Sequence, residues 1–332
     1  MGIMVYVFNK VIVTGGAGFI GSHIVDYIIG NKLAEHVVVI DNLSSGSVEN
    51  IEQWINTGSL QLIVADLKKF DEKWVTAFKG VDAVLHLAAN PEVRISSIEP
   101  RVHFEENVVA TFNVLEASRV HDVGVHFFAS SSTVYGDARV IPTPETYPLE
   151  PISVYGASKA ACEMLYHSYH KLYGFSVAIA RYANIIGPRS THGVVVDFIK
   201  KLRKNPFKLE ILGDGAQRKS YLYISDAVEA SMMLLDLCKK NRGFHVFNVG
   251  NEDWVTVREI ADIVVKEMGL VNVEYVHRPM TPDGRGWPGD VKLMLLDISK
   301  LKELGWRPKI PSTLAIKITA REHIARIAGN VQ

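Results

Sequence analysis

The first 180 residues alternate short apolar runs with segments of helical spacing. The apolar runs lie at Lys10–Thr14, His36–Ile40, Leu60–Val64, Asp82–Leu87, Val125–Ala129 and Ser176–Arg181. Helical spacing falls between several of them, at Gly18–Ile29, Val102–Val120 and Ser153–Tyr173. Short buried strands that alternate with helices are typical of a parallel sheet covered on both faces. The pattern therefore predicts an α/β fold built on a doubly wound parallel sheet.

After about residue 183 the pattern changes. Prolines punctuate shorter elements, and helices are predicted at Val194–Lys204, Ser225–Lys239, Val257–Met268 and Ser312–Ile327, with a strand at Lys292–Leu296. We interpret residues 184–332 as a smaller mixed α/β domain with long loops that packs against the first. Residues 1–183 form the first domain, which we expect to receive further elements from about 221–250.

Composition excludes several classes of protein. The 332 residues include 36 Lys+Arg and 36 Asp+Glu, so the chain lacks the basic excess of most nucleic-acid-binding proteins. Its two cysteines, Cys162 and Cys238, are far apart, so neither a disulfide framework nor a metal site is expected. A reducing compartment fits this cysteine content.

The chain shows no sign of membrane insertion or export. No apolar run approaches the roughly 18 residues that a membrane helix needs. Met4–Phe8 is too short for the core of a signal peptide. We therefore expect a cytoplasmic protein, and the sequence does not decide whether Met1 or Met4 is its true start.

A glycine-rich turn joins the first strand to the first helix. Gly15, Gly18 and Gly21 have the GxxGxxG spacing, with Phe19 and Ile20 opening the helix. Such a turn lets a pyrophosphate approach bare backbone N–H groups at a helix N-terminus. Asp41 lies 20 residues beyond Gly21, where it can accept hydrogen bonds from ribose hydroxyls. The motif predicts a Rossmann-type dinucleotide site.

The residues around Asp41 favour NAD over NADP. Asn42 and Leu43 follow it, and no Arg or Lys stands nearby to hold a 2′-phosphate. Further cofactor contacts are predicted at strand ends and in adjoining loops, at Ser45, Gly46, Asp66, Leu67, Leu87, Ala88 and Ala89. Asp66 can equally be an ordinary helix N-terminal acid, and Leu87–Ala89 an ordinary exit from a strand.

A second motif predicts proton transfer. Tyr155 and Lys159 are four residues apart, so they share one face of a helix. A nearby ammonium and the positive ring of an oxidised nicotinamide both favour the phenolate of Tyr155. Serines at 130–132 end the preceding strand and offer hydroxyls beside the phenol. We predict that Tyr155 is a general base.

Together these motifs resemble the extended short-chain dehydrogenase/reductase family, and within it the UDP-glucose (UDP-galactose) 4-epimerases. The resemblance runs from about Lys10 to Trp306. It implies that Ser131 supplies the catalytic hydroxyl, that Asn107 and Tyr182 belong to the cofactor site, and that Asn184 contacts the substrate diphosphate. It also implies that residues 1–183 form the NAD-binding domain and that residues 184–332 form the substrate domain, which binds the nucleotide sugar.

Two segments depart from the family pattern. Lys219 stands where the family has an Arg that binds diphosphate, with Arg218 one residue earlier. Trp287 replaces the Arg of the segment that ends at Asp290, so Arg218 and Arg285 become candidate diphosphate ligands, unless they are solvated surface residues. The resemblance also places a pocket gate at Met294, which can equally be a core residue.

The resemblance implies an NAD-dependent 4-epimerase that interconverts UDP-glucose and UDP-galactose through a 4-keto intermediate, with NAD tightly bound and regenerated each cycle. The dehydratases of the family carry an Asp-Glu pair where this chain has Ser132 and Thr133. A 4-epimerase of a UDP-N-acetylhexosamine or UDP-uronate is the alternative, followed by a dehydratase or reductase. A protein that only senses dinucleotides is less compatible, because Tyr155, Lys159 and Ser131 are all present.

A homodimer is also expected. The two predicted helices at Val102–Val120 and Ser153–Tyr173 carry apolar residues beyond a single stripe, and a second stripe must be buried somewhere. These residues are Phe104, Val108, Phe112, Leu115, Met164, Leu165, Tyr169 and Leu172. In the family, the two helices pair with their copies.

Overall fold

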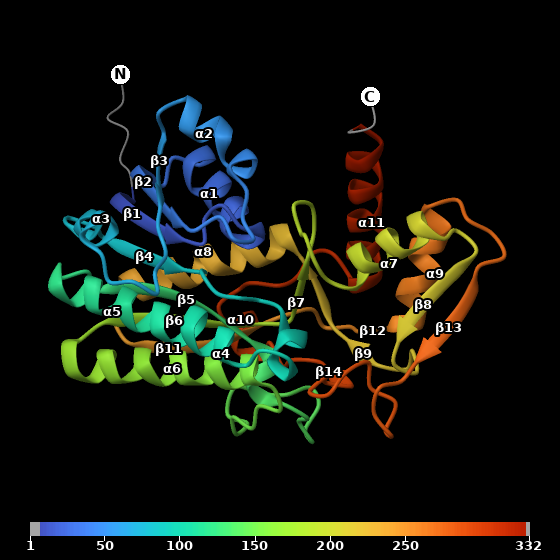
Figure 1. Cartoon of the computed structure of the whole chain (residues 1–332). Coiled ribbons are helices and arrows are strands. Elements are labelled where there is room, and N and C mark those ends of the chain that lie inside the picture. Colours follow the sequence, from blue (N-terminus) through green and yellow to red (C-terminus); the bar gives the residue numbers. More distant parts are fainter. Residues whose placement is uncertain (1–6, 330–332) are drawn as a thin grey trace.

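The structure is a computed structural model that describes residues 7–329. A seven-stranded parallel sheet with the strand order β3-β2-β1-β4-β5-β6-β11 forms its centre (Figure 1). The strands are β1 (Phe8–Thr14), β2 (Ala34–Asp41), β3 (Leu60–Val64), β4 (Ala83–His86), β5 (Val125–Ser131), β6 (Ser176–Tyr182) and β11 (Phe244–Val249). The predicted Rossmann-type doubly wound fold is confirmed.

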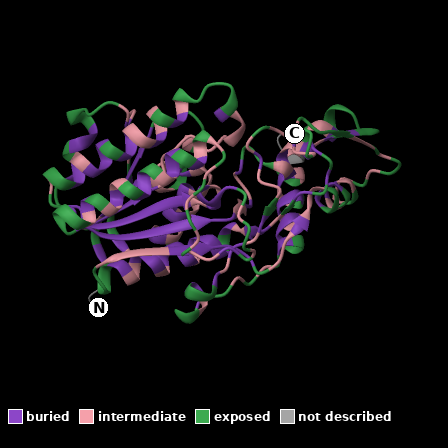
Figure 2. Cartoon of the chain, turned by 90° about the horizontal axis from the view of Figure 1, so that it is seen from below, coloured by how far each residue is buried: buried purple, intermediate pink, exposed green. Residues whose placement is uncertain are grey.

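Helices cover both faces of this sheet because neighbouring strand residues point to opposite sides. Val11 and Val13 of β1 pack in one apolar cluster, whereas Ile12 belongs to another on the opposite face. The main covering helices are α1 (Phe19–Gly30) and α8 (Ile224–Lys240) on one side, and α3 (Glu72–Val75), α5 (Ala110–Val120) and α6 (Val154–Tyr173) on the other. Figure 2 shows the buried strands between outer surfaces that are largely exposed.

The helix predicted at Val102–Val120 is present but not uniform. It consists of α4 (Arg101–His103), a π-helical turn η4 (Phe104–Val109) and α5. The wider turn leaves the carbonyl of Asn107 to accept a bond from Cys162 Sγ at 3.4 Å. Such turns often mark functional sites.

The last strand of the sheet arrives late in the chain. β11 pairs in parallel with β6 over six residue pairs, from Phe244↔Val177 to Val249↔Tyr182. The helix α8 that precedes β11 packs on β5 and β6. Elements from residues 224–249 thus complete the sheet that the first 182 residues begin.

A second lobe lies beside the sheet and has its own apolar core (Figure 1). Its main elements are α7 (Val194–Lys204), α9 (Val257–Glu267), α11 (Ser312–Gly329) and the parallel pair β8 (Lys208–Leu212) and β13 (Glu274–Arg278). A Thr256–Glu259 capping box begins α9. We propose that this lobe corresponds to the predicted substrate domain, with a boundary near residue 183.

Short strands connect the two lobes. They form the pair β7 (Asn184–Ile186) and β10 (Tyr221–Tyr223), and the triplet β12 (Val255–Thr256), β9 (Arg218–Lys219) and β14 (Leu293–Met294). The strand predicted at Lys292–Leu296 therefore shrinks to two residues. The remaining elements are short helices: η1 (Val48–Asn50), α2 (Glu52–Asn56), η2 (Thr76–Phe78), η3 (Val93–Ser97), η5 (Ser132–Tyr135) and α10 (Ser299–Glu303).

Within residues 7–329, no helix is both long and apolar enough to span a bilayer. Cys162 and Cys238 are buried and free. The two candidate start residues, Met1 and Met4, lie outside the described residues.

Candidate active site

A cavity of about 480 Å³ lies at the carboxyl ends of the sheet strands and extends to residues of the second lobe. Most of the residues predicted from the sequence line it: Gly15, Gly18, Phe19, Ile20, Gly21, Asp41, Asn42, Ser45, Asp66, Leu67, Leu87, Ala88, Ala89, Ser131, Tyr155, Lys159, Tyr182, Asn184, Lys219, Asp290 and Met294. Four do not line it: Gly46, Asn107, Arg218 and Arg285. Ligands commonly bind at this edge of an open α/β sheet.

The glycine turn fits a diphosphate. Gly15 has φ +69°, and a Cβ there would lie 2.7 Å from Ala88 N, so a side chain is excluded. A Cβ on Gly21 would overlap the Gly15 carbonyl. Helix α1 begins at Gly18 without a side-chain cap and without an acid in its first turn. Its first N–H groups are therefore available to an anion.

Asp41, at the end of β2, fits a ribose. Its carboxylate accepts bonds from Ala17 N at 3.0 Å and Leu43 N at 2.8 Å. A carboxylate has about four lone-pair positions, so two remain for hydroxyls. Gly46 supports this region from behind, because a Cβ there would lie 2.8 Å from the Ala17 carbonyl carbon.

We expect Asp41→Ala to weaken NAD binding by roughly 10- to 100-fold, the effect of losing one or two hydrogen bonds to a charged group. The change also leaves two backbone N–H groups without their acceptor, so a modest loss of thermal stability should accompany it. The measurement is NAD content after gel filtration, together with calorimetric affinity at a temperature where the variant is folded. Asp236→Ala, on the partly exposed side of α8, is the control. Unchanged NAD affinity in Asp41→Ala would remove Asp41 from the cofactor site.

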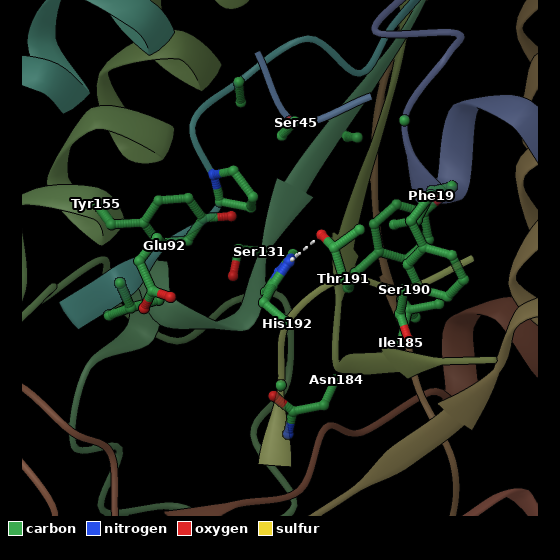
Figure 3. Close-up of a pocket in the computed structure, with 18 of the residues that line it drawn as sticks. Phe19, Ser45, Glu92, Ser131, Tyr155, Asn184, Ile185, Ser190, Thr191 and His192 are labelled. Atoms are coloured by element: carbon green, nitrogen blue, oxygen red, sulfur yellow. Dashed lines mark hydrogen bonds between the residues drawn. The ribbon is translucent and has the colours of Figure 1, made fainter. Parts of the chain in front are cut away.

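Helix α6 places the proton-transfer pair. Ser153 caps the helix by accepting from Gly156 N at 3.1 Å, and Tyr155 N donates to Ser96 Oγ at 3.1 Å. Figure 3 shows the Tyr155 hydroxyl and Ser131 facing the same space. Lys159 lies one turn further along α6, and its ammonium group donates a hydrogen bond to the Ala129 carbonyl at 2.9 Å.

Burial sets the direction of the pKa shifts of Tyr155 and Lys159. Burial raises the pKa of Tyr155 to about 12, and the Ser131 hydroxyl only partly opposes this. Burial also lowers the pKa of Lys159 to about 8. Lys159 is not among the groups that shift the pKa of Tyr155, because its ammonium turns to Ala129 and lies 6.0 Å from the phenol ring centroid. The expectation that Lys159 lowers the Tyr155 pKa also involves the positive ring of an oxidised nicotinamide, and it stays a prediction.

Ser131 is arranged as a hydrogen-bond donor toward the cavity. Its Oγ accepts from Thr133 N at 3.2 Å and from Thr133 Oγ1 at 2.9 Å. With its lone pairs engaged, the hydroxyl proton is left for an oxygen in the cavity. That oxygen would also be within the reach of Tyr155.

Two predicted cofactor residues are held away from the cavity or only partly reach it. Asn107 is buried on the π-helical turn, where it accepts from Asn90 N at 2.7 Å and donates to Ser158 Oγ at 2.8 Å. It therefore links the loop after β4 to α6. Tyr182 lines the cavity, but its hydroxyl is bonded to Ser231 Oγ on α8.

The basic residues of the substrate side are only partly those expected. Lys219 lines the cavity and bonds Asp290 at 2.6 Å. Arg218 is exposed beside Trp254, and Arg285 is held by Asp137 and Asp283. Neither arginine lines the cavity, because Arg218 lies against Trp254 at the surface and the acidic partners of Arg285 hold its guanidinium.

Sequence reasoning missed Glu92, Arg94 and His192, which also line the cavity. The Arg94 guanidinium lies 5.9 Å from the centroid of Trp287, and the Lys219 ammonium lies 5.4 Å from the same ring. The available signal was position alone, since Glu92 and Arg94 follow a strand whose carboxyl end faces the site. Nothing in the local sequence indicated that these side chains point into the cavity.

Met294 is both a core residue and a residue of the cavity wall. It is 8% exposed, belongs to the main apolar cluster and lines the cavity. Asn184 also lines the cavity, with its amide donating to the Ser220 carbonyl at 3.1 Å. Its side-chain oxygen stays available to a ligand.

Comparison with known proteins identifies the family. Residues 11–250 match the model of the NAD dependent epimerase/dehydratase family. A putative UDP-glucose 4-epimerase of Methanocaldococcus jannaschii is 36% identical over 92% of this chain and 96% of its own. A crystal structure of a UDP-galactose 4-epimerase is 49% identical, with a TM-score of 0.84, over 96% of this chain and 99% of its own. UDP-glucuronic acid decarboxylase 4 of Arabidopsis thaliana is 34% identical over 97% of this chain and 70% of its own. The chain belongs to the NAD-dependent epimerase/dehydratase family, and its cofactor is NAD.

Proposed function

We propose that this protein is a 4-epimerase that interconverts UDP-glucose and UDP-galactose. The observation that carries the proposal is the pairing of Tyr155 with Ser131 at one cavity wall, with no carboxylate at positions 132 and 133. Epimerisation at C4 needs one base, one hydroxyl donor and a redox cofactor. Relatives with epimerase names support the reaction, although decarboxylases are also among the similar proteins.

The carboxylates that do line the cavity are already engaged. Asp41 accepts backbone N–H groups, Asp66 and Glu106 lie 3.7 Å from Lys68, Glu92 bonds Arg94, Asp197 bonds Lys201 and Asp290 bonds Lys219. An elimination of water needs an acid–base pair beside the oxidised carbon. The engaged state of these groups therefore favours epimerisation over dehydration.

The proposed mechanism assigns the following roles. Bound NAD supplies the hydride acceptor and donor. Tyr155 takes the proton of the sugar 4-hydroxyl, while Ser131 donates a hydrogen bond to the same oxygen. Oxidation at C4 gives a 4-keto sugar, which turns over and is reduced on its other face. Lys219 and Asn184 hold the diphosphate during this turn, and Lys159 holds the cofactor ribose.

We also propose a homodimer formed by the helices near η4, α5 and α6. Phe104, Phe112, Met164 and Leu172 are exposed by 46–71%, as an unpartnered apolar face would be. Leu115 and Tyr169 of the same helices are buried against the sheet. The two helices therefore carry apolar residues on more than one face, and only the exposed face is available to a second copy. A cytoplasmic location remains part of this proposal.

The proposal is tested by incubating the purified protein with UDP-glucose and following the appearance of UDP-galactose. We expect turnover in both directions without added NAD, because the cofactor should stay bound and be regenerated in each cycle. Tyr155→Phe supplies the blank. Loss of carbon dioxide from UDP-glucuronate, or a 6-deoxy product from UDP-glucose, would instead assign a decarboxylase or a dehydratase.

A further inference from the structure

Glu92 is a carboxylate of the cavity wall whose position Arg94 fixes. It caps the short helix η3 and accepts from Arg94 N at 3.2 Å. The Arg94 side chain adds bonds from Nε at 3.0 Å to Oε1 and from Nη2 at 3.0 Å to Oε2. Three of about four lone-pair positions are therefore used, and one on Oε2 is open. The Glu92 side chain is 36% exposed.

The carboxylate is fixed close to the reactive end of the site. Helix η3, which Glu92 caps, also contains Ser96, whose Oγ accepts from Tyr155 N. Figure 3 shows Glu92 and the Tyr155 hydroxyl, with His192, around one space. A sugar whose C4 oxygen lies at Tyr155 would turn its neighbouring substituents toward Glu92.

Glu92 offers negative charge and no donor. Hydrogen bonding by Arg94 holds its pKa below the usual value, so it is ionised at neutral pH. His192 does not neutralise it, because burial lowers the pKa of that imidazole. Arg94 is paired with Glu92 and lies beside Trp287, so its charge is already compensated and does not attract a substrate carboxylate.

We infer that Glu92 is a specificity residue that accepts a hydrogen bond from a hydroxyl of a neutral hexose and excludes nucleotide sugars with a carboxylate at C6. The inference rests on the proposed function, since it takes the sugar to be bound with C4 at Tyr155. A hydroxymethyl group can donate to the open position on Oε2. A uronate carboxylate has no proton to donate, leaves that acceptor unpaired and meets a like charge.

The test compares binding of UDP-glucose, UDP-glucuronate and UDP to the NAD-loaded protein by calorimetry. For the wild type we expect UDP-glucose to bind at least about tenfold more tightly than UDP-glucuronate, the effect of one partly solvated like-charge contact. Glu92→Gln keeps the size but removes the charge, and should move this ratio about tenfold toward UDP-glucuronate. Glu92→Ser, a smaller neutral variant, should move it in the same direction. Glu99→Gln is the matched control, because Glu99 follows in the same segment and is exposed.

UDP separates a sugar contact from a structural effect. If Glu92 acts on the sugar, the affinity for UDP is unchanged in Glu92→Gln, whereas an equal loss for all three ligands would overturn the inference. An unchanged ratio in both Glu92 variants, or a wild type that prefers UDP-glucuronate, would overturn it as well. Turnover is followed separately. If the wild type epimerises UDP-glucose but the ratio of the two affinities is unchanged in the Glu92 variants, only this inference is overturned. If the wild type binds UDP-glucose but does not epimerise it, the proposed function is overturned.

Discussion

Tyr155→Phe is expected to lower kcat by roughly 10²- to 10⁴-fold, the usual contribution of a general base. The change removes one oxygen at the cavity wall and leaves the hydrogen bond from the Tyr155 backbone N–H to Ser96 in place. The fold and the NAD content should therefore be retained. Turnover of UDP-glucose measured beside bound NAD per protomer checks the result.

The same helix offers a matched control for this variant. Tyr166 is fully buried on α6, and its hydroxyl has no hydrogen-bond partner among the described residues. Tyr166→Phe removes the same atom from the same helix, away from the cavity, and should keep normal turnover. Near-normal activity in Tyr155→Phe, or equal losses in both variants, would contradict the assignment of Tyr155.

Arg181→Met is expected to lower the free energy of unfolding by about 3–5 kcal/mol, because it leaves a buried carboxylate without its cation. Arg181 bonds Glu163 with Nη2 at 2.6 Å and with Nε at 3.0 Å, and both side chains are at most 6% exposed. Ser130 Oγ donates to the same carboxylate at 2.5 Å. The network therefore fixes the end of β5 against α6, directly behind Ser131 and Lys159.

Urea unfolding of the wild type and the variants measures the effect. The double variant Arg181→Met with Glu163→Leu removes both charges and should recover part of the loss, since apolar replacement of a whole buried pair is often neutral. A single variant that loses less than about 1 kcal/mol would show that water or a rearranged side chain replaces Arg181. A double variant that is less stable than the single one would likewise show that Glu163 finds another partner when Arg181 is removed.

The sheet could be predicted from the sequence because its strands are short apolar runs between helices of clear period. β3 was predicted at its observed bounds, and β1, β2 and β5 within two residues at each end. The strand β11 had no separate prediction beyond the expectation that residues 221–250 join the first domain. Its outer residues are only partly buried, so the run Phe244–Val249 carries a weaker signal.

The motif residues that line the cavity on the sheet side could also be found from the sequence, because short motifs fix their positions locally. Gly15, Asp41 and Tyr155 each belong to a turn, a strand end or a helix face whose geometry follows from spacing alone. The charged residues that line the rest of the cavity could not be predicted in this way. Arg218 lies beside Trp254 and Arg94 beside Trp287, and both aromatic neighbours lie far from these arginines in the chain. The orientation of a side chain on a loop depends on tertiary packing, which the local sequence does not encode.

The late arrival of β11 has a consequence for synthesis of the chain. Until Phe244–Val249 leaves the ribosome, β6 is the outer strand of an unfinished sheet, with its apolar residues and one row of backbone groups open. At about 5–20 residues per second, that interval lasts on the order of ten seconds or less. Open strand edges recruit other strands, so a nascent chain is most exposed to aggregation in this interval. Slow translation across residues 183–243 would lengthen it.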